Sequence, residues 1–367
     1  MKRVYASAAL VGLLALGLTA CGSDDPTGDS GSTGSSSLSG TLNGGGASSQ
    51  DKAQQAWIAG FQQANGDVTV NYTKSDSGAG RKGLLDGSLS YAGTDSALTS
   101  DEIADSSSTC AAGQAFDVPV YISPIAVAFN VAGVDSLNLD ADTVAKIFDG
   151  TITTWDDPAI TADNADVAAS LTGPISVMYR SDDSGTTKNF TEYLSEAAPS
   201  VWTHEVSSTF PVSKDTFQGL NGTSAVVQGI QDASGTIGYA DASGIGDLAT
   251  VKIKVGDDFV GPTAEGAAAT LDVSERSTDD RADHDIVFSI NRTTTEAGAY
   301  PVILVSYLAV CDTYDTTAQA DLVKGFLTYV ISSEGQAQAA SAAGSAPISE
   351  ALRTEAQSAV DSITAKD

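Results

Sequence analysis

Basic residues are scarce in this chain of 367 residues. It carries 18 Lys and Arg against 47 Asp and Glu, which gives a formal net charge of −29. A surface that binds nucleic acid needs a basic footprint, so we do not expect nucleic acid as a partner. Because the overall charge repels anions, an anion site would have to be built locally from backbone dipoles and single basic side chains.

Histidines and catalytic motifs are scarce as well. The two histidines, His204 and His284, both lie in polar stretches. The sequence contains no H-E-x-x-H, no G-x-x-x-x-G-K-[ST] and no G-x-S-x-G motif. We therefore predict a protein that is not an enzyme and that uses no metal and no cofactor.

Long apolar runs are missing except near the start of the sequence. Lys2 and Arg3 precede an apolar run over residues 8–18. This pattern is typical of a secretory signal over residues 1–20, and the run is too short to span a bilayer comfortably. The run ends in Leu-Thr-Ala-Cys, which resembles the bacterial lipobox and implies cleavage before Cys21 with lipid on its sulfur. A plain signal peptide with a chance cysteine is the alternative.

The chain has three cysteines, and Cys21 is the first of them. The other two are Cys110 and Cys311. Since disulfides persist in exported proteins, we predict one Cys110–Cys311 bridge, with two unpaired buried thiols as the alternative. Residues 21–37 are rich in Gly, Ser and Asp, which predicts a flexible tether that holds the folded part away from a membrane.

The most informative stretch is the polar turn over residues 180–187, Arg-Ser-Asp-Asp-Ser-Gly-Thr-Thr. It follows a strand-like run at residues 175–179, and apolar residues at helical spacing come after it: Phe190, Tyr193, Leu194 and Ala197. A strand, a turn and a helix start direct free backbone N–H groups at whatever lies above the turn. Arg180 adds a planar fork of donors, and Asp182 can hold that fork in place. This predicts an anion site; a helix cap beside a surface arginine is the alternative.

Three further stretches end in small polar residues. Residues 44–51 form a glycine-rich stretch, which predicts a turn entering a helix marked by Ala53, Trp57 and Phe61. The strand-like run at 68–72 leads into Ser-Asp-Ser-Gly-Ala-Gly at 75–80, and the run at 89–95 ends in Asp95. Residues 78–83 also fit G-x-G-x-x-G, which is a weak dinucleotide signal. An exported protein has little access to NAD, and Ser77 suits a small anion better.

Strands and helices alternate along the rest of the chain, which favours an α/β fold. Two long strand-like runs stand out, at residues 118–129 and 300–310. Residues 256–285 are polar and are expected to be irregular. Shorter strands are predicted at 235–240 and 251–255, and helices around 144–148, 322–331 and 352–363.

Taken together, these motifs resemble the periplasmic phosphate-binding proteins, the substrate-binding lipoproteins of the phosphate ABC transporter. The resemblance runs from about Leu42 to the C-terminus. The motifs that carry it are Gly46-Ala47-Ser48-Ser49, Asp76-Ser77-Gly78-Ala79-Gly80, Gly93-Thr94-Asp95, Arg180-Ser181-Asp182-Asp183-Ser184-Gly185-Thr186 and Gly235-Thr236-Ile237-Gly238-Tyr239. The pair Cys110 and Cys311 is similar to that of actinobacterial members.

The resemblance implies a two-lobed periplasmic-binding-protein fold of the type II kind. One lobe would hold residues 38–122 plus 301–367 and the other residues 123–300. Two crossovers would join the lobes, and the ligand would lie in the cleft between them. The protein would be an exported monomer, lipid-anchored to the outer face of the cell membrane, that binds inorganic phosphate and delivers it to the transporter's permease.

The resemblance also implies the site. In this sequence the family's ligand contacts fall on Ser48, Ser49, Ser77, Asp95, Arg180, Ser184, Gly185 and Thr186, with Asp182 orienting Arg180. Asp95 would accept the proton that phosphate keeps near neutral pH, and would repel sulfate, which has none. Three other functions stay open: an exported phosphatase or phosphotransferase with a serine nucleophile, a binding protein for another tetrahedral oxyanion, and an adhesin or surface antigen with no ligand.

Overall fold

The computed structural model describes residues 38–111, 113–278 and 281–366. The predicted signal, the tether and Cys21 lie outside the described residues. Within the described ranges, no helix is long and apolar enough to cross a membrane.

The centre of the fold is an eleven-stranded sheet with the main order β2-β1-β3-β13-β4-β8-β6-β7. The first part of the sheet consists of the strands β1 (Gly40–Ala47), β2 (Val68–Ser75), β3 (Tyr91–Thr94) and β13 (Ile303–Cys311). Its second part holds β5 (Ser136–Leu139), β6 (Ser176–Arg180), β7 (Phe217–Leu220), β8 (Thr236–Asp241), β9 (Ala249–Val255) and β10 (Asp258–Val260). The strand β4 (Ala115–Asn130) belongs to both.

Strand β4 joins the two parts because its halves pair with different strands. Residues 115–124 run antiparallel to β13, and residues 125–130 run antiparallel to β8. Every residue of β4 except Asn130 is buried, as expected for an apolar run inside a sheet covered on both faces. The two long strand-like runs predicted at 118–129 and 300–310 are thus confirmed as strands.

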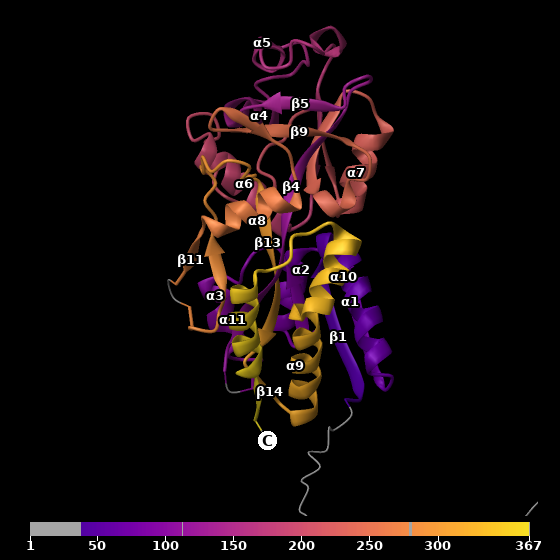
Figure 1. The fold of residues 1–367 in the computed structure, drawn as a ribbon, viewed down its shortest axis with the longest axis vertical. Helices are drawn as coiled ribbons and strands as arrows, with labels where there is room; N and C mark the ends of the chain where they lie inside the picture. The colour runs from indigo at the N-terminus through magenta and orange to yellow at the C-terminus, as the bar shows by residue number, and fades with distance from the viewer. Residues whose placement is uncertain (1–37, 112, 279–280, 367) are drawn as a thin grey trace, which may run out of the picture. The chain divides into compact units, whose positions relative to one another are not determined.

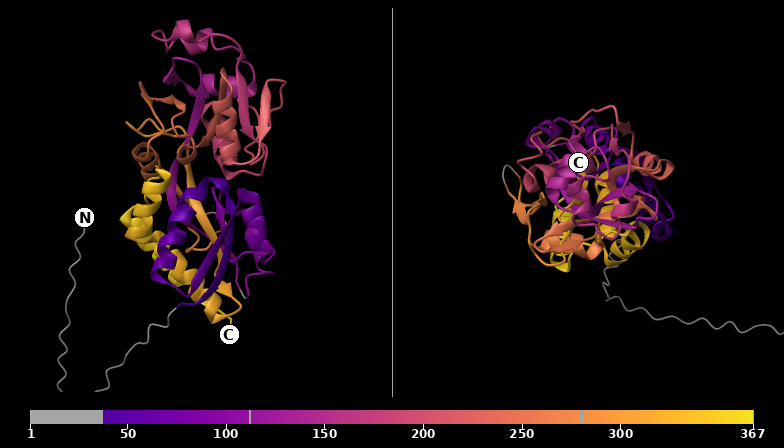
Figure 2. Two further views of the ribbon diagram at one scale, coloured as in Figure 1. Left: turned by 90° about the vertical axis from the view of Figure 1, so that its right-hand side faces the viewer. Right: turned by 90° about the horizontal axis from the view of Figure 1, so that it is seen from above.

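Helices cover both parts of the sheet (Figures 1 and 2). One group of helices follows strands of the first part or lies near the C-terminus. It consists of α1 (Asp51–Ala64), α2 (Ser77–Leu85), α3 (Ser100–Ser106), α9 (Thr317–Ile331), α10 (Ser333–Ala343) and α11 (Glu350–Asp361). The others are α4 (Ala141–Asp149), α5 (Pro158–Thr161), α6 (Gly185–Ala197), α7 (Thr223–Asp232) and α8 (Ala264–Asp272).

Smaller elements complete the described chain. Three short 3-10 helices are η1 (Ser48–Gln50), η2 (Ala168–Ser170) and η3 (Ala242–Gly244). Two strand pairs lie off the main sheet, β11 (Glu275–Ser277) with β12 (Val287–Ser289) and β14 (Thr313–Tyr314) with β15 (Thr364–Ala365).

Two predictions about local structure were wrong. Residues 44–47, expected to be part of a glycine-rich turn, are the last residues of β1. Residues 256–285, expected to be irregular, contain β10, helix α8 and strand β11. Helix α8 begins at a cap, because the Thr263 hydroxyl accepts a hydrogen bond from the Gly266 N–H.

An aromatic cluster in the second part fixes the start of α6. The rings of Phe190 and Tyr239 stack with centroids 4.4 Å apart, and Phe148 packs edge-on against Phe190 at 4.7 Å. From this apolar base the Tyr239 hydroxyl forms a hydrogen bond with the Thr187 hydroxyl at 2.7 Å. Burial raises the pKa of Tyr239, so this hydroxyl stays protonated. The cluster therefore holds the first turn of α6 in place.

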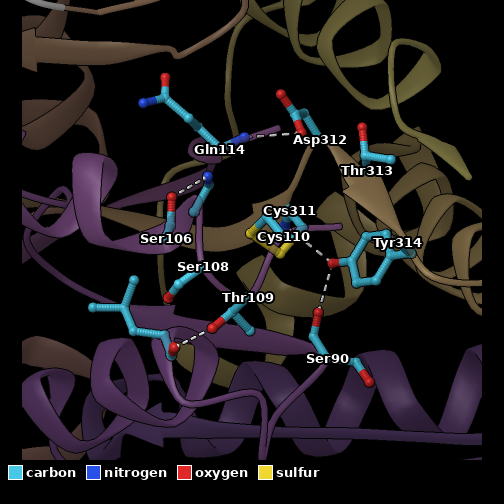
Figure 3. Close-up of a disulfide and its surroundings, with 12 residues drawn as sticks. Ser90, Ser106, Ser108, Thr109, Cys110, Gln114, Cys311, Asp312, Thr313 and Tyr314 are labelled. Atoms are coloured by element: carbon cyan, nitrogen blue, oxygen red, sulfur yellow. Dashed lines mark hydrogen bonds between the residues drawn. A yellow bond between two sulfur atoms is a disulfide. The ribbon is translucent and has the colours of Figure 1, made fainter. Parts of the chain in front are cut away.

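The predicted disulfide is present between Cys110, just beyond α3, and Cys311, at the end of β13 (Figure 3). It joins residues 201 positions apart, with their Cα atoms separated by 5.2 Å. Tyr314 lies beside it: the Tyr314 hydroxyl accepts from the Cys311 N–H and donates to the Ser90 carbonyl at 2.6 Å. The hydrogen bonds of Tyr314 beside the bridge therefore connect β13 with the stretch before β3.

Candidate functional site

The polar residues predicted from the sequence meet where the strands end. Strands β1, β2 and β3 run parallel, so their carboxyl ends lie at one edge of the sheet. Ser48 and Ser49 follow β1, Ser77 follows β2, and Asp95 follows β3. Arg180 is the last residue of β6, in the second part of the sheet.

Asp95 is the centre of this group and is only 2% exposed. Its Oδ1 accepts a hydrogen bond from the Ser306 hydroxyl at 2.8 Å. Its Oδ2 accepts from the Thr186 hydroxyl at 3.2 Å and from the Ser49 hydroxyl. The Asp95 N–H donates to the Ser77 hydroxyl oxygen at 3.3 Å. The carboxylate is thus held by three hydroxyls from different stretches of the chain, and a fourth hydroxyl, that of Ser77, bonds the Asp95 backbone.

The Asp95 carboxylate is a hydrogen-bond acceptor that can accept one more hydrogen bond. Burial raises its pKa, while the bonds from Ser49 and Ser306, the charge of Arg180 and the bond from Thr186 oppose that shift. A carboxylate offers about four acceptor positions. Three hydroxyls occupy three of them, so one position remains on Oδ1.

Arg180 is held by the second aspartate of its turn. The Arg180 Nε donates to Asp182 Oδ1 at 2.7 Å, and a second guanidinium nitrogen donates to Oδ2, a bidentate pair. Burial acts to raise the pKa of Asp182, but the bonds and charge of Arg180 and the Gly222 N–H outweigh it and lower that pKa. Asp182 is therefore ionised, and it fixes the plane of the guanidinium group.

The start of α6 packs directly against Asp95. Ser184 is the N-cap, and its hydroxyl oxygen accepts from the Thr187 N–H at 3.2 Å. A Cβ placed on Gly185 would lie 2.8 Å from the Asp95 Cβ and 2.8 Å from the Ser77 hydroxyl oxygen. Only a residue without a side chain fits there, so the positive end of α6 comes close to the carboxylate.

Three residues of this group were missed in the sequence. Ser306 lies in the middle of β13 and donates to Asp95. Asn189 donates to the Asp95 carbonyl at 2.6 Å and to the Gly185 carbonyl at 2.9 Å. Thr223 begins α7 and contacts both Arg180 and Ser48. Gly222-Thr223-Ser224 repeats the small polar helix start found elsewhere and could have drawn attention to Thr223; Ser306 gave no such signal.

The glycine pattern at residues 78–83 does not form a phosphate loop. All six residues lie within helix α2. Gly80 packs against the backbone of Gly46 and Gly93, which a Cβ at Gly80 would meet at 2.7–3.0 Å. The Gly78 N–H donates to the Asp183 carbonyl at 3.2 Å. These glycines serve close packing, and the dinucleotide interpretation is wrong.

A cavity of about 370 Å³ opens beside Asp95 and is separate from the group that surrounds Arg180. It is lined by residues after β3, by α6 and by the stretch around β12, among them Asp95, Lys188, Arg281 and Phe288. None of Ser48, Arg180 or Ser184 lines it. Among the residues that the structure describes, no cluster of three or more His, Cys, Asp or Glu side chains could hold a metal ion.

This arrangement, a sheet in two parts with polar residues gathered at its strand ends, defines the two-lobed periplasmic-type binding proteins. A family model described as "PBP superfamily domain" matches residues 31–334. The chain is 33% identical to phosphate-binding protein PstS 2 of Mycobacterium tuberculosis, over 98% of this chain and 99% of that protein. It is 35% identical to PstS 3 of Mycobacterium leprae, over 88% and 90%. The chain belongs to the phosphate-binding proteins of this superfamily.

Solved structures agree on the fold. A phosphate-binding protein from Stenotrophomonas maltophilia superposes with a TM-score of 0.71 at 22% identity, covering 87% of this chain and 94% of that one. A high-affinity periplasmic phosphate-binding protein, PfluDING, superposes with a TM-score of 0.73 at 23% identity, over 87% and 93%. The predicted two-lobed α/β fold is confirmed.

Proposed function

We propose that this protein binds inorganic phosphate outside the cell and delivers it to the permease of a phosphate ABC transporter. The observation that carries the proposal is the buried Asp95 carboxylate, held by three hydroxyls beside the start of α6. The relatives named phosphate-binding proteins support the same ligand. The groups that hold the anion are Ser48, Ser49, Ser77, Asp95, Arg180, Ser184, Gly185 and Thr186, with Asp182 orienting Arg180.

The charges at the site suit a dianion without any lysine. The starts of α2 and α6 and the turn η1 that leads into α1 lie around the site, and each helix start offers roughly half a positive charge. Arg180 adds a full charge, with its fork already fixed by Asp182. Hydrogen bonds to a charged group contribute about 1.5–3 kcal/mol each. A few of them suffice for sub-micromolar affinity, which needs about −8 kcal/mol.

Asp95 is the element that selects among tetrahedral anions. A carboxylate repels a neighbouring anion unless that anion donates a proton to it. Phosphate keeps at least one proton near neutral pH, and sulfate keeps none. The free acceptor position on Asp95 therefore suits phosphate and disfavours sulfate.

Several further features belong to this proposal. One lobe holds residues 38–122 and 301–367, and the other holds residues 123–300. The protein is exported through the signal at 1–20, carries lipid on Cys21, is spaced from the membrane by residues 21–37, and acts as a monomeric receptor, not an enzyme. The relatives' names, which are those of binding proteins, support the receptor role.

The test is a thermal melt of the full-length chain stripped of anions, with phosphate or sulfate added at equal ionic strength. Because a ligand that binds only the folded state raises the melting temperature, phosphate is expected to raise it and sulfate is not. Asp95→Asn is expected to lose that selectivity, while Asp105→Asn, which removes the same charge from an exposed helix, keeps it. No shift with phosphate in the wild-type chain would overturn the proposal.

A further inference from the structure

Helix α7 begins without a cap from its own sequence. Its N-cap residue is Gly222, with φ 80°, and no side chain of the N-cap accepts a hydrogen bond there. Most of the other described helices carry a cap of their own, from Asp76, Thr99, Asp140, Asp157, Ser184, Thr263, Thr316, Ser332 and Ser349. The unsatisfied N–H groups of α7 therefore need a partner from elsewhere.

That partner is Ser48, which lies 175 positions away and follows β1 in the first part of the sheet. The Thr223 N–H donates to the Ser48 hydroxyl oxygen at 3.1 Å, and the two hydroxyl oxygens are also 3.1 Å apart. Helix α7 packs on β8 and β6 in the second part. The cap of α7 therefore joins the two parts of the molecule.

The Thr223 hydroxyl has a partner in each part of the molecule. An Arg180 guanidinium nitrogen donates to its oxygen at 3.3 Å. The Ser48 hydroxyl oxygen lies 3.1 Å away, and either hydroxyl can donate in that pair, while the Thr223 N–H donates to the Ser48 oxygen. Since a hydroxyl has one donor and two acceptor positions, Thr223 can bond Arg180 and Ser48 at the same time.

The same helix start also touches the group that holds Arg180. The Gly222 N–H donates to Asp182 Oδ1 at 3.2 Å, on the oxygen that receives the Arg180 Nε. Asp182, Arg180, Thr223 and Ser48 thus form one connected chain. A change at Ser48 alters the number of partners that Thr223 has, and through Thr223 it reaches Arg180.

We infer that Ser48 caps α7 across the two lobes and that Thr223 is a positioning residue, which couples lobe closure to the orientation of Arg180. This inference rests on the proposed phosphate binding and deepens it. Ser48 and Ser49 then have different roles: Ser49 donates a hydrogen bond to Asp95, and Ser48 caps α7 in the closed state. Contacts formed only on closure slow ligand release more than they speed capture.

The experiment compares Thr223→Val, Thr223→Ser and Ser48→Ala in the full-length chain. Thr223→Val keeps the backbone cap and removes only the hydroxyl. We expect it to raise the phosphate dissociation rate about three- to tenfold, with the association rate within twofold of wild type, because the hydroxyl bond to Ser48 and the one that Arg180 donates are both lost. Thr223→Ser is expected to restore the slow release. The melting temperature without phosphate is expected to stay within about a degree of wild type for Thr223→Val and Thr223→Ser, because both keep the backbone cap, whereas Ser48→Ala removes that cap and is expected to lower it by about 2–4 °C.

The double variant and a remote cap complete the design. If Thr223 acts through Ser48, adding Thr223→Val to Ser48→Ala causes little further change in the dissociation rate. Ser349→Ala removes the cap of α11, where the Ser349 hydroxyl accepts from the Leu352 N–H, and is expected to leave phosphate kinetics unchanged. Additive effects of the two variants, or wild-type release from Thr223→Val, would overturn the inference while leaving phosphate binding standing. Failure of the wild-type chain to bind phosphate would overturn both.

Discussion

At the scale of single residues, two aspartates in one site have different properties because their partners differ. Asp95 is surrounded by hydroxyls and has a raised pKa. Asp182 pairs with Arg180 and has a lowered pKa. The first can receive a proton-bearing ligand, and the second is a permanent counter-charge. Both follow a strand in the sequence, so the difference between their pKa values comes from the groups that the fold places beside them.

A third buried aspartate allows a prediction about pH. Asp241 ends β8, and its Oδ1 accepts from the Ser243 N–H at 2.9 Å. Burial, together with the charge of Asp95, raises its pKa to about 6. The folded state therefore holds this proton more tightly than the unfolded chain, whose Asp pKa is about 3.9. Stability from this group is present below pH 4 and is lost as the pH rises through 6.

Asp241→Asn isolates this contribution. The free energy of unfolding of the variant relative to wild type is expected to rise by about 2 kcal/mol from pH 4 to pH 7, since one pKa unit corresponds to about 1.4 kcal/mol and the unfolded Asp is already about half ionised at pH 4. Chemical denaturation across this range measures it. Asp117, whose pKa burial and Asp285 raise to about 7, titrates in both proteins and cancels in the difference. A difference that does not change with pH would contradict the prediction.

At the scale of secondary-structure elements, the sequence predicted the helix starts better than the glycine-rich strand. Strand β1 has three glycines directly before its last residue, Ala47, because its neighbours lie too close for side chains. A Cβ at Gly44 would meet the Tyr91 ring at 2.1–2.5 Å, and one at Gly46 would meet the Gly93 carbonyl at 2.1 Å. Glycine usually marks a turn, so local reasoning favoured one here. The strand exists because partners on both sides supply its hydrogen bonds.

The missed site residues have a similar explanation. Ser306 belongs to an apolar strand whose register against β3 and β4 no local pattern encodes. Thr223 meets Ser48 only through packing of two distant elements. The predicted residues, by contrast, each stood at a strand end or helix start, where sequence signals are strong. The sequence therefore indicated which strand ends carry the site but not how the two parts of the chain meet.

Helix α6 supplies a prediction at this scale. Gly185→Ala would place a methyl group 2.8 Å from Asp95 and Ser77 atoms, a distance that forces the helix start away from the carboxylate. We expect phosphate affinity to fall at least tenfold, because Thr186 and the N–H groups of that turn move with the helix. Isothermal titration measures the change. Gly66→Ala is the matched control, since no atom lies within 4 Å of its added Cβ, and equal affinities for the two variants would refute the steric argument.

At the scale of the whole molecule, the Cys110–Cys311 bridge closes a very long loop. Its two residues are 201 positions apart, so most of the second part of the sheet lies between them. A cross-link of this kind stabilises chiefly by restricting the unfolded chain. We expect the double variant Cys110→Ser, Cys311→Ser to lose about 2–5 kcal/mol of unfolding free energy. Urea denaturation of both proteins, with Cys21 intact in each, measures the loss.

The same double variant tests whether the bridge affects phosphate binding as well as the stability of the fold. The bridge lies at the far end of β13 from its pairing with the middle of β4, whereas Asp95 is held by Ser306, five positions earlier on that strand. Ser306 pairs with Tyr121 of β4, and the next residue, Tyr307, pairs with Thr94 of β3, so strand pairing keeps Ser306 in place without the sulfur atoms. Phosphate affinity at 25 °C is therefore expected to stay within about threefold of wild type, and saturating phosphate is expected to raise the unfolding free energy of both proteins by the same amount. A variant that folds but binds phosphate tenfold more weakly would mean that the bridge, and not the strand pairing, positions Ser306.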